Sequence, residues 1–216
     1  VDQNFVVRNR IFDMWIGDWD RHEGQWRWAE LEDEQGNELY RPIPEDRDNA
    51  FFKFDGFFPW WLRRKWALRK FQKFNGDIRD IAGLNYNARY FDRRFLTSLS
   101  LEQWLAEADI LKQRLTDQVI EKAVHQWPEK IYALNGEEII NYLKARRDKL
   151  NDFANRYYNV LAEEVNIHGS DESEYFEVVR KNDHQTQVRV FDLSDDGIAE
   201  LLFESIISSA ETKEVR

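Results

Sequence analysis

The sequence predicts an α+β protein, in which a mainly helical body over residues 1–165 is followed by a small antiparallel β-unit over residues 166–216. Three observations support this prediction. Apolar residues recur at three- and four-residue spacing through most of the body. Two short alternating runs near the N-terminus are separated by turn residues, and alternation returns after Val165. The chain ends in Val215-Arg216, which has the character of a strand cut off in mid-run.

The composition is that of a packed, acidic protein. Hydrophobic residues make up 42% of the 216 residues and aromatic residues 15%, which is enough for a sizeable core. The net charge of -10 speaks against a nucleic-acid partner, because phosphates repel an acidic surface. The absence of cysteine excludes disulfides and thiolate metal sites.

The first helix is expected over residues 4–16, with Asn4 as its N-cap and Gly17 at its end. Its helical spacing is carried by Phe5, Arg8, Phe12, Trp15 and Ile16. Residues 26–32 and 39–43 then alternate as two strands around the turn Gln35-Gly36-Asn37. Because a hairpin returns the chain to its starting point, the loops on either side of it should face each other.

Further helices are marked by their caps. Ser100 and Gln103 form a capping-box pattern, and Thr116 caps a helix that should end near Trp127-Pro128. Residues 137–165 are predicted to be one long helix. Its apolar stripe consists of Ile139, Leu143, Leu150, Phe153, Tyr157 and Leu161.

The β-unit is predicted from two alternating runs, 175–180 and 188–191, with turn residues at Asn182-Asp183. Residues 199–207 are ambiguous, although Leu202, Glu204 and Ile206 fit a strand.

The two loops flanking the hairpin contain the strongest indication of chemistry. Asp20 is followed five residues later by Gln25, and Asp46 and Asp48 follow the return strand. Phosphoryl transfer needs a base or orienting group for the acceptor hydroxyl and oxygen ligands for a divalent cation. In kinases a catalytic-loop Asp, a metal-binding amide five residues on, a hairpin and a second metal-binding Asp occur in this order.

Three segments resemble known proteins. The run 16–22, Ile-Gly-Asp-Trp-Asp-Arg-His, resembles the catalytic loop of the secretory-pathway kinases of casein-like substrates, which carries a Gly-Asn-x-Asp-Arg-His pattern. Residues 42–51 are similar to the metal-binding segment of the CotH spore-coat kinases. Residues 165–178 resemble the part that follows the kinase-like body in large cell-surface proteins of Bacteroidetes, some of which continue into an outer-membrane β-barrel.

The resemblance implies a role for each site residue. Asp20 would be the catalytic base, and His22 would orient its loop. Asp48 would be the metal ligand, Gln25 the second ligand, and Asp46 would assist. The implied cofactors are Mg²⁺ or Mn²⁺ and ATP, and the implied acceptor is a protein or glycan hydroxyl.

The resemblance also implies a fragment. The body is similar to a kinase C-lobe alone, with the glycine-rich cover, phosphate-binding Lys and its Glu partner expected upstream of Val1. Asp18 stands where the family has Asn. We therefore expect partners in an upstream nucleotide lobe and a downstream outer-membrane barrel, a location in the bacterial cell envelope, and no turnover by this chain alone.

Other interpretations stay open. The acids could form a solvated loop paired with Arg21, Arg41 and Arg47, in a non-catalytic envelope scaffold or interaction module. A metal-dependent phosphoesterase is a third option. Residues 57–74 carry six Lys/Arg and no acid among many aromatics, which fits core packing, membrane-surface contact or substrate binding. His125 is expected to be structural.

Overall fold

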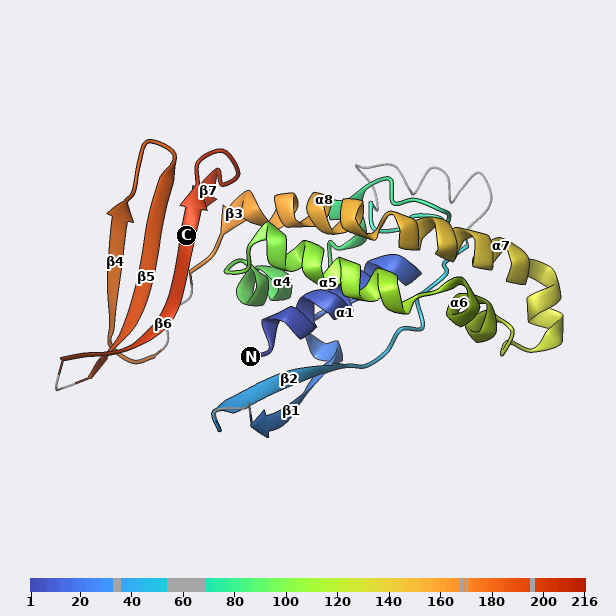
Figure 1. Ribbon diagram of the computed structural model, residues 1–216, viewed down its shortest axis with the longest axis horizontal. Coiled ribbons are helices and arrows are strands. Elements are labelled where there is room, and N and C mark those ends of the chain that lie inside the picture. Colours follow the sequence, from blue (N-terminus) through green and yellow to red (C-terminus); the bar gives the residue numbers. More distant parts are fainter. Residues whose placement is uncertain (33–35, 54–68, 168, 170, 195–196) are drawn as a thin grey trace.

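The computed structural model describes residues 1–32, 36–53, 69–167, 169, 171–194 and 197–216 (Figure 1). The predicted fold class is confirmed, since a helical body carries an antiparallel hairpin near its N-terminus and an antiparallel sheet at its C-terminal end. In Figure 1 the three-stranded sheet lies at one end of the helices, and the hairpin lies along one side of them.

The helical body is built around α1 (Gln3–Ile16), against which α5 (Leu101–Arg114) and α8 (Leu150–Ala162) pack. The remaining described helices are α3 (Ile81–Leu84), α4 (Arg89–Leu96), α6 (Asp117–Val124) and α7 (Glu129–Asp148). Trp104 and Tyr157 are fully buried where α5 meets α8, with ring centroids 5.9 Å apart. Burial of such large apolar side chains is the main stabilising contribution.

Helix α1 differs from its prediction at its start and in its buried face. Its N-cap is Asp2, whose side chain accepts a hydrogen bond from Phe5 N, so the assignment to Asn4 was wrong. Gly17 ends the helix at φ 74, as expected. The buried positions are Val6, Val7, Arg10, Ile11, Asp13, Met14, Trp15 and Ile16, whereas Phe5, Arg8 and Phe12 are only partly buried.

The later caps are confirmed, and the long helix is corrected. Ser100 and Gln103 make the reciprocal capping box, and the Thr116 side chain accepts from Val119 N. The predicted helix 137–165 is two helices, α7 and α8, which meet at Lys149. All six residues of the predicted apolar stripe are buried, because α7 and α8 both direct their part of the stripe toward the core.

The hairpin consists of β1 (Trp26–Glu32) and β2 (Glu38–Pro44), paired antiparallel with Trp26 opposite Pro44. In the β-unit, β4 (Glu174–Arg180), β5 (Gln185–Ser194) and β6 (Gly197–Ser208) form an antiparallel sheet, so the ambiguous run is a strand. The short strands β3 (Glu164–Val165) and β7 (Glu214–Val215) pair in parallel where the two parts meet.

Most of the aromatic-basic segment 57–74 lies outside the described residues. In its described part, Phe74 is buried in the core and the Phe71 ring lies 4.6 Å from the Trp19 ring. The predicted membrane-surface contact of the segment stays a prediction. His125 stacks on Tyr132 at 4.7 Å, in keeping with a structural role. Among the described helices, none has both the length and the apolarity that crossing a bilayer requires.

Candidate functional site

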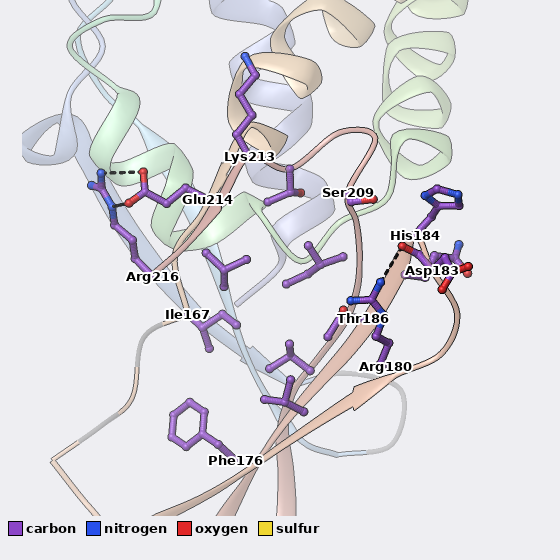
Figure 2. Close-up of a pocket in the computed structure, with 16 residues that line it drawn as sticks. Ile167, Phe176, Arg180, Asp183, His184, Thr186, Ser209, Lys213, Glu214 and Arg216 are labelled. Carbon is purple, nitrogen blue, oxygen red and sulfur yellow. Dashed lines mark hydrogen bonds and ion pairs between the residues drawn. The ribbon is translucent and has the colours of Figure 1, made fainter.

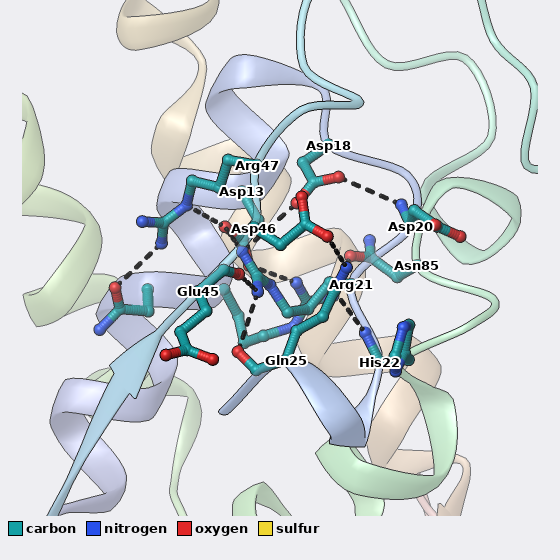
Figure 3. A network of polar contacts seen from close by, with 12 residues as sticks. Asp13, Asp18, Asp20, Arg21, His22, Gln25, Glu45, Asp46, Arg47 and Asn85 are labelled. Atoms are coloured by element: carbon teal, nitrogen blue, oxygen red, sulfur yellow. Dashed lines mark hydrogen bonds and ion pairs between the residues drawn. The ribbon is translucent and has the colours of Figure 1, made fainter. Parts of the chain in front are cut away.

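The hairpin brings the two acidic loops together at its open end (Figure 3). The turn η1 (Glu23–Gln25) leads into β1, and Glu45 N donates to the Gln25 carbonyl at 2.9 Å. The side chains meet as well, since Gln25 Nε2 donates to Asp46 Oδ2 at 3.3 Å. We refer to Asp20, Gln25, Asp46 and Asp48 together as the acidic corner.

Asp46 and Asp48 interact strongly within this corner. Asp46 adopts a left-handed backbone with φ 54, and its Oδ1 accepts from Asp48 N at 3.4 Å. Hydrogen bonds, first that from the Asp48 backbone, lower the pKa of Asp46. The side-chain hydrogen bond with Asp46 and the charge of Asp46 raise the pKa of Asp48, and the charge of Asp20 adds to this. Exposed carboxylates that repel one another in this way would be stabilised by a shared cation.

Gln25 does not present its oxygen to these carboxylates. Its Oε1 accepts from His22 N at 3.2 Å, while His22 Nδ1 accepts from Gly24 N at 3.1 Å, which together form a capping box around η1. The amide nitrogen therefore faces Asp46. In this conformation Gln25 orients Asp46, and metal ligation by Gln25 would require its amide to leave His22.

Asp20 is half-buried and held from the helical body. Its Oδ1 accepts from Asn87 Nδ2 at 2.7 Å, and Lys70 Nζ lies 3.8 Å away while also packing over the Trp19 ring. Neither Asn87 nor Lys70 was singled out as a site residue from the sequence. No local pattern could have identified Asn87, which is 67 residues from its partner.

Below the acidic corner, Asp13 binds three arginines. Its carboxylate has no exposed surface and accepts from Arg10 at 2.8 Å, Arg21 at 2.9 Å and Arg47 at 2.8 Å. Burial would raise the pKa of Asp13, but the charges of Arg10, Arg47 and Arg21 outweigh it and lower the pKa. The buried carboxylate is thus kept charged at neutral pH.

Arg21 connects both loops to α1. Its guanidinium is 1% exposed and donates to Asp13 and to the carbonyls of Gln25 and Glu45. Since Gln25 and Glu45 lie at the two ends of the hairpin, this one side chain fixes the separation of the two loops. The arrangement explains why an arginine follows Asp20 directly.

The three arginines proposed as partners of a solvated acidic loop bind carboxylates outside the acidic corner. Arg47 binds Asp13, and Arg41 binds Asp2 at 2.9 Å. Arg21 reaches Asp18 at 3.4 Å in addition to Asp13. Within the described residues, Arg21 therefore pairs with one acid of the first loop, Asp18, and none of the three arginines forms an ion pair with Asp20, Asp46 or Asp48.

The corner meets part of what a hard divalent cation requires. Asp46 and Asp48 supply exposed carboxylate oxygens, which Mg²⁺ and Mn²⁺ prefer. Within the described residues, no three or more His, Cys, Asp or Glu side chains are arranged as a ready-made cation site. Any cation would therefore be held by few protein ligands, as is common for Mg²⁺.

Two of the cavities in the described part of the chain involve the C-terminal β-unit and lie away from the acidic corner. One of about 440 Å³ lies in the β-unit and is lined by Ile167 and Phe176 among other apolar residues (Figure 2). Charged groups at its edge have partners, such as Glu214 for Arg216 and the Asp183 carbonyl for Arg180. The other, about 460 Å³, lies between α8 and β6.

No family model, no curated protein and no solved structure matches this chain. Its function is therefore inferred from the geometry of the acidic corner and from the resemblance of the two loops.

Proposed function

We propose that this chain is the metal-binding, C-lobe-like part of an atypical kinase, which transfers the γ-phosphoryl group of ATP to a protein or glycan hydroxyl. The observation that supports this most is the convergence at the acidic corner. The hairpin puts Asp46 and Asp48 beside the loop that carries Asp20, which is the order of parts that phosphoryl transfer uses.

Each residue has a defined task in this proposal. Asp46 and Asp48 hold Mg²⁺ or Mn²⁺, and Gln25 orients Asp46 through its amide nitrogen. Asp20 accepts the proton of the acceptor hydroxyl, with Asn87 fixing its carboxylate. A cation bound here would neutralise phosphate charge. His22 maintains the η1 turn through its capping interactions.

The nucleotide lobe and the envelope location rest on the resemblance alone. The proposal expects the nucleotide lobe in another segment of the protein, and an outer-membrane barrel after the β-unit. The 216-residue chain should accordingly bind the cation but not turn over ATP.

Cation binding can be tested directly on this chain. In a titration with Mn²⁺ followed by ¹H–¹⁵N NMR, paramagnetic broadening should be strongest at amides of residues 18–25 and 45–49. Asp46→Asn and Asp48→Asn should each weaken binding about tenfold, which corresponds to about 1.4 kcal/mol. Asp183→Asn is the matched control, because Asp183 is an exposed aspartate of the β-unit.

The result also separates the alternatives. Equal binding in wild type, Asp46→Asn and Asp48→Asn would refute the metal site and favour the non-catalytic scaffold. In the intact protein, Asp48→Ala should abolish metal-dependent nucleotide binding, whereas Asp20→Ala should abolish transfer and leave binding intact. A phosphoesterase would instead need a second cation about 3.5–4 Å from the first.

A further inference from the structure

Strand β4 forms an open edge of the C-terminal sheet. In Figure 1 it is the outermost strand, on the side of the sheet away from the helices. The strand order is β4-β5-β6, and no other described strand pairs with β4. An edge strand exposes a row of backbone donors and acceptors, which is a template for a further strand.

The hydrogen bonds at the two ends of β4 show which of its backbone groups face outward. Leu193 N donates to the Ser173 carbonyl at 2.9 Å. Lys181 N donates to the Gln185 carbonyl at the same distance. Because the groups that face a partner alternate along an antiparallel strand and the register is unbroken, the odd-numbered positions face β5. The N–H and C=O groups that face away from β5 include those of Phe176, Val178 and Arg180.

The β4 edge lacks the features that usually prevent pairing. Edge strands are commonly protected by a lysine, a proline or a bulge. Strand β4 contains neither Lys nor Pro, and its pairing with β5 is regular throughout. The pairing of β6, at the other edge, shifts its register against β5 in two places. Continuation of the sheet is therefore favoured at β4.

The side chains at this edge are apolar and exposed. Phe176 is 47% exposed and Val178 is 65% exposed. They lie opposite Val190 and Val188 of β5, which are 1% and 5% exposed. The apolar face of the sheet is thus buried at its centre and open to solvent along β4.

The charges of β4 are complementary to a second copy of the same strand. Glu174 begins the strand and Arg180 ends it, so antiparallel pairing sets the acid of each copy opposite the arginine of the other. The same register sets Phe176 opposite Val178. These positions all have outward-facing backbone parity, as the hydrogen-bonded pairs of an antiparallel ladder require.

The remaining charges are compatible with this register. Glu177 would lie opposite its own copy, and within each chain it forms an ion pair with Arg189 of β5, which offsets the repulsion. The Arg180 guanidinium donates to the carbonyls of Asn182 and Asp183, and no described carboxylate forms an ion pair with it. The dimer supplies such a partner.

We propose that the chain forms a two-fold symmetric dimer, in which the β4 strands of two copies pair antiparallel and join two three-stranded sheets into one. The contact is the same on both copies and closes on itself, so association stops at the dimer. The inference does not rest on the proposed phosphoryl transfer. Asp48→Asn should weaken cation binding and leave association unchanged, which separates the two proposals experimentally.

Sedimentation velocity of the full chain between about 5 and 500 µM tests the proposal, since this range brackets a weak micromolar interface. The mass should rise with concentration from 26.1 kDa toward twice that value. Val178→Lys should weaken association at least about tenfold, because it puts a charge on the paired edge. Leu202→Lys is the matched control, since Leu202 is 51% exposed on β6, and it should associate as wild type does.

The register can be tested by disulfide formation, because the chain has no cysteine of its own. Glu177→Cys would set two thiols opposite each other in a non-hydrogen-bonded pair, with Cα atoms about 4.5 Å apart, which a disulfide can bridge. In Val179→Cys the two thiols would be four residues out of step, about 14 Å along the strand. Mild oxidation should therefore yield a covalent dimer of Glu177→Cys only.

Three outcomes would overturn the proposal. A chain that stays at 26.1 kDa over the whole range would refute self-pairing, in favour of a strand from another polypeptide. Undiminished association of Val178→Lys, shown to be folded by circular dichroism, would place the interface away from β4. Equal cross-linking of Glu177→Cys and Val179→Cys would refute the register.

Discussion

Replacing Asp13 with asparagine should destabilise the folded chain by about 3–5 kcal/mol, the usual cost of removing one partner from a buried ion pair. Although Asp13 binds three arginines, the expected loss is that of one broken ion pair, because Arg10 and Arg47 can be compensated. Arg10 keeps Asp92 at 3.0 Å, and the Arg47 side chain is 27% exposed and can be hydrated. Arg21 is 1% exposed and would keep a single carboxylate, that of Asp18 at 3.4 Å, beside the carbonyls of Gln25 and Glu45. Arg21 therefore bears most of the loss.

The effect can be measured by urea unfolding at pH 7, followed by far-UV circular dichroism. In a separate thermal unfolding experiment, a loss of this size in the free energy of unfolding should lower the melting temperature by about 6–20 °C in a chain of this length. Asp152→Asn is the matched control, since Asp152 is 54% exposed and pairs with Arg156 at 3.2 Å on the surface of α8. If Asp13→Asn costs no more than the control, which should lose less than about 1 kcal/mol, the reasoning fails.

The stability of Asp13→Asn should also depend on pH differently from that of wild type. The pKa of Asp13 is lowered in the folded chain, so between that pKa and the unfolded value near 4 the unfolded chain binds more protons. This contribution to stability is complete above about pH 4 and is lost as pH falls through the folded pKa. Wild type should therefore lose more stability than Asp13→Asn on acidification below pH 4, and equal losses would contradict the assignment.

Three further substitutions should shift the urea midpoint at constant m-value. Gly17→Ala should cost about 2–4 kcal/mol, because φ is 74 and an added Cβ would lie 2.8 Å from Phe74 Cδ2; a change below 1 kcal/mol would contradict this. Ser100→Ala should cost about 1 kcal/mol through loss of the N-cap, and an unchanged midpoint would speak against the capping box. Arg146→Lys should cost about 2–4 kcal/mol, since one Nζ cannot occupy the positions of both Nη1, which donates to the Asn75 and Asp77 carbonyls, and Nη2, which donates to the Met14 carbonyl; full stability would refute that role.

The parts of the fold that were predicted correctly are specified by neighbouring residues. A capping box needs Ser100 and Gln103 only, and a hairpin needs two alternating runs and a turn. The division at Lys149 was missed because no Gly or Pro marks it, and the apolar stripe continues through it from Leu143 to Leu150.

The buried ions were missed for a different reason. Arg10 and Asp13 look like a solvated face of α1 in sequence, yet Arg10 pairs with Asp92 of α4, which also accepts a hydrogen bond from the Tyr157 hydroxyl of α8. Asp13 in turn binds Arg21 and Arg47, which lie in the two loops beyond α1. Such long-range pairing leaves no local pattern. The face of α1 was consequently assigned to partly exposed residues such as Phe12.

For the acidic corner, the sequence predicted that the two loops meet but not how their side chains are oriented. The hairpin alone implies that the loops meet, so the approach of Gln25 to Asp46 followed from chain geometry. Which amide atom faces Asp46 depends on the short turn η1 and on the hydrogen bond from His22 N. The orientation of the Gln25 amide therefore could not be predicted from the sequence.

The hydrogen bonds of Arg21 have a practical consequence for engineering. They fix the base of the hairpin, whereas the far end near Gly36 is about 20 Å away along six residue steps of strand. A Cβ added at Gly36 would meet no atom within 4 Å, although its φ of 84 favours glycine or asparagine there. The tip is therefore a suitable attachment point for a fluorophore, a spin label or an immobilisation tag. A label carried there would lie at the far end of the hairpin from the acidic corner and would leave the contacts of Arg21 undisturbed.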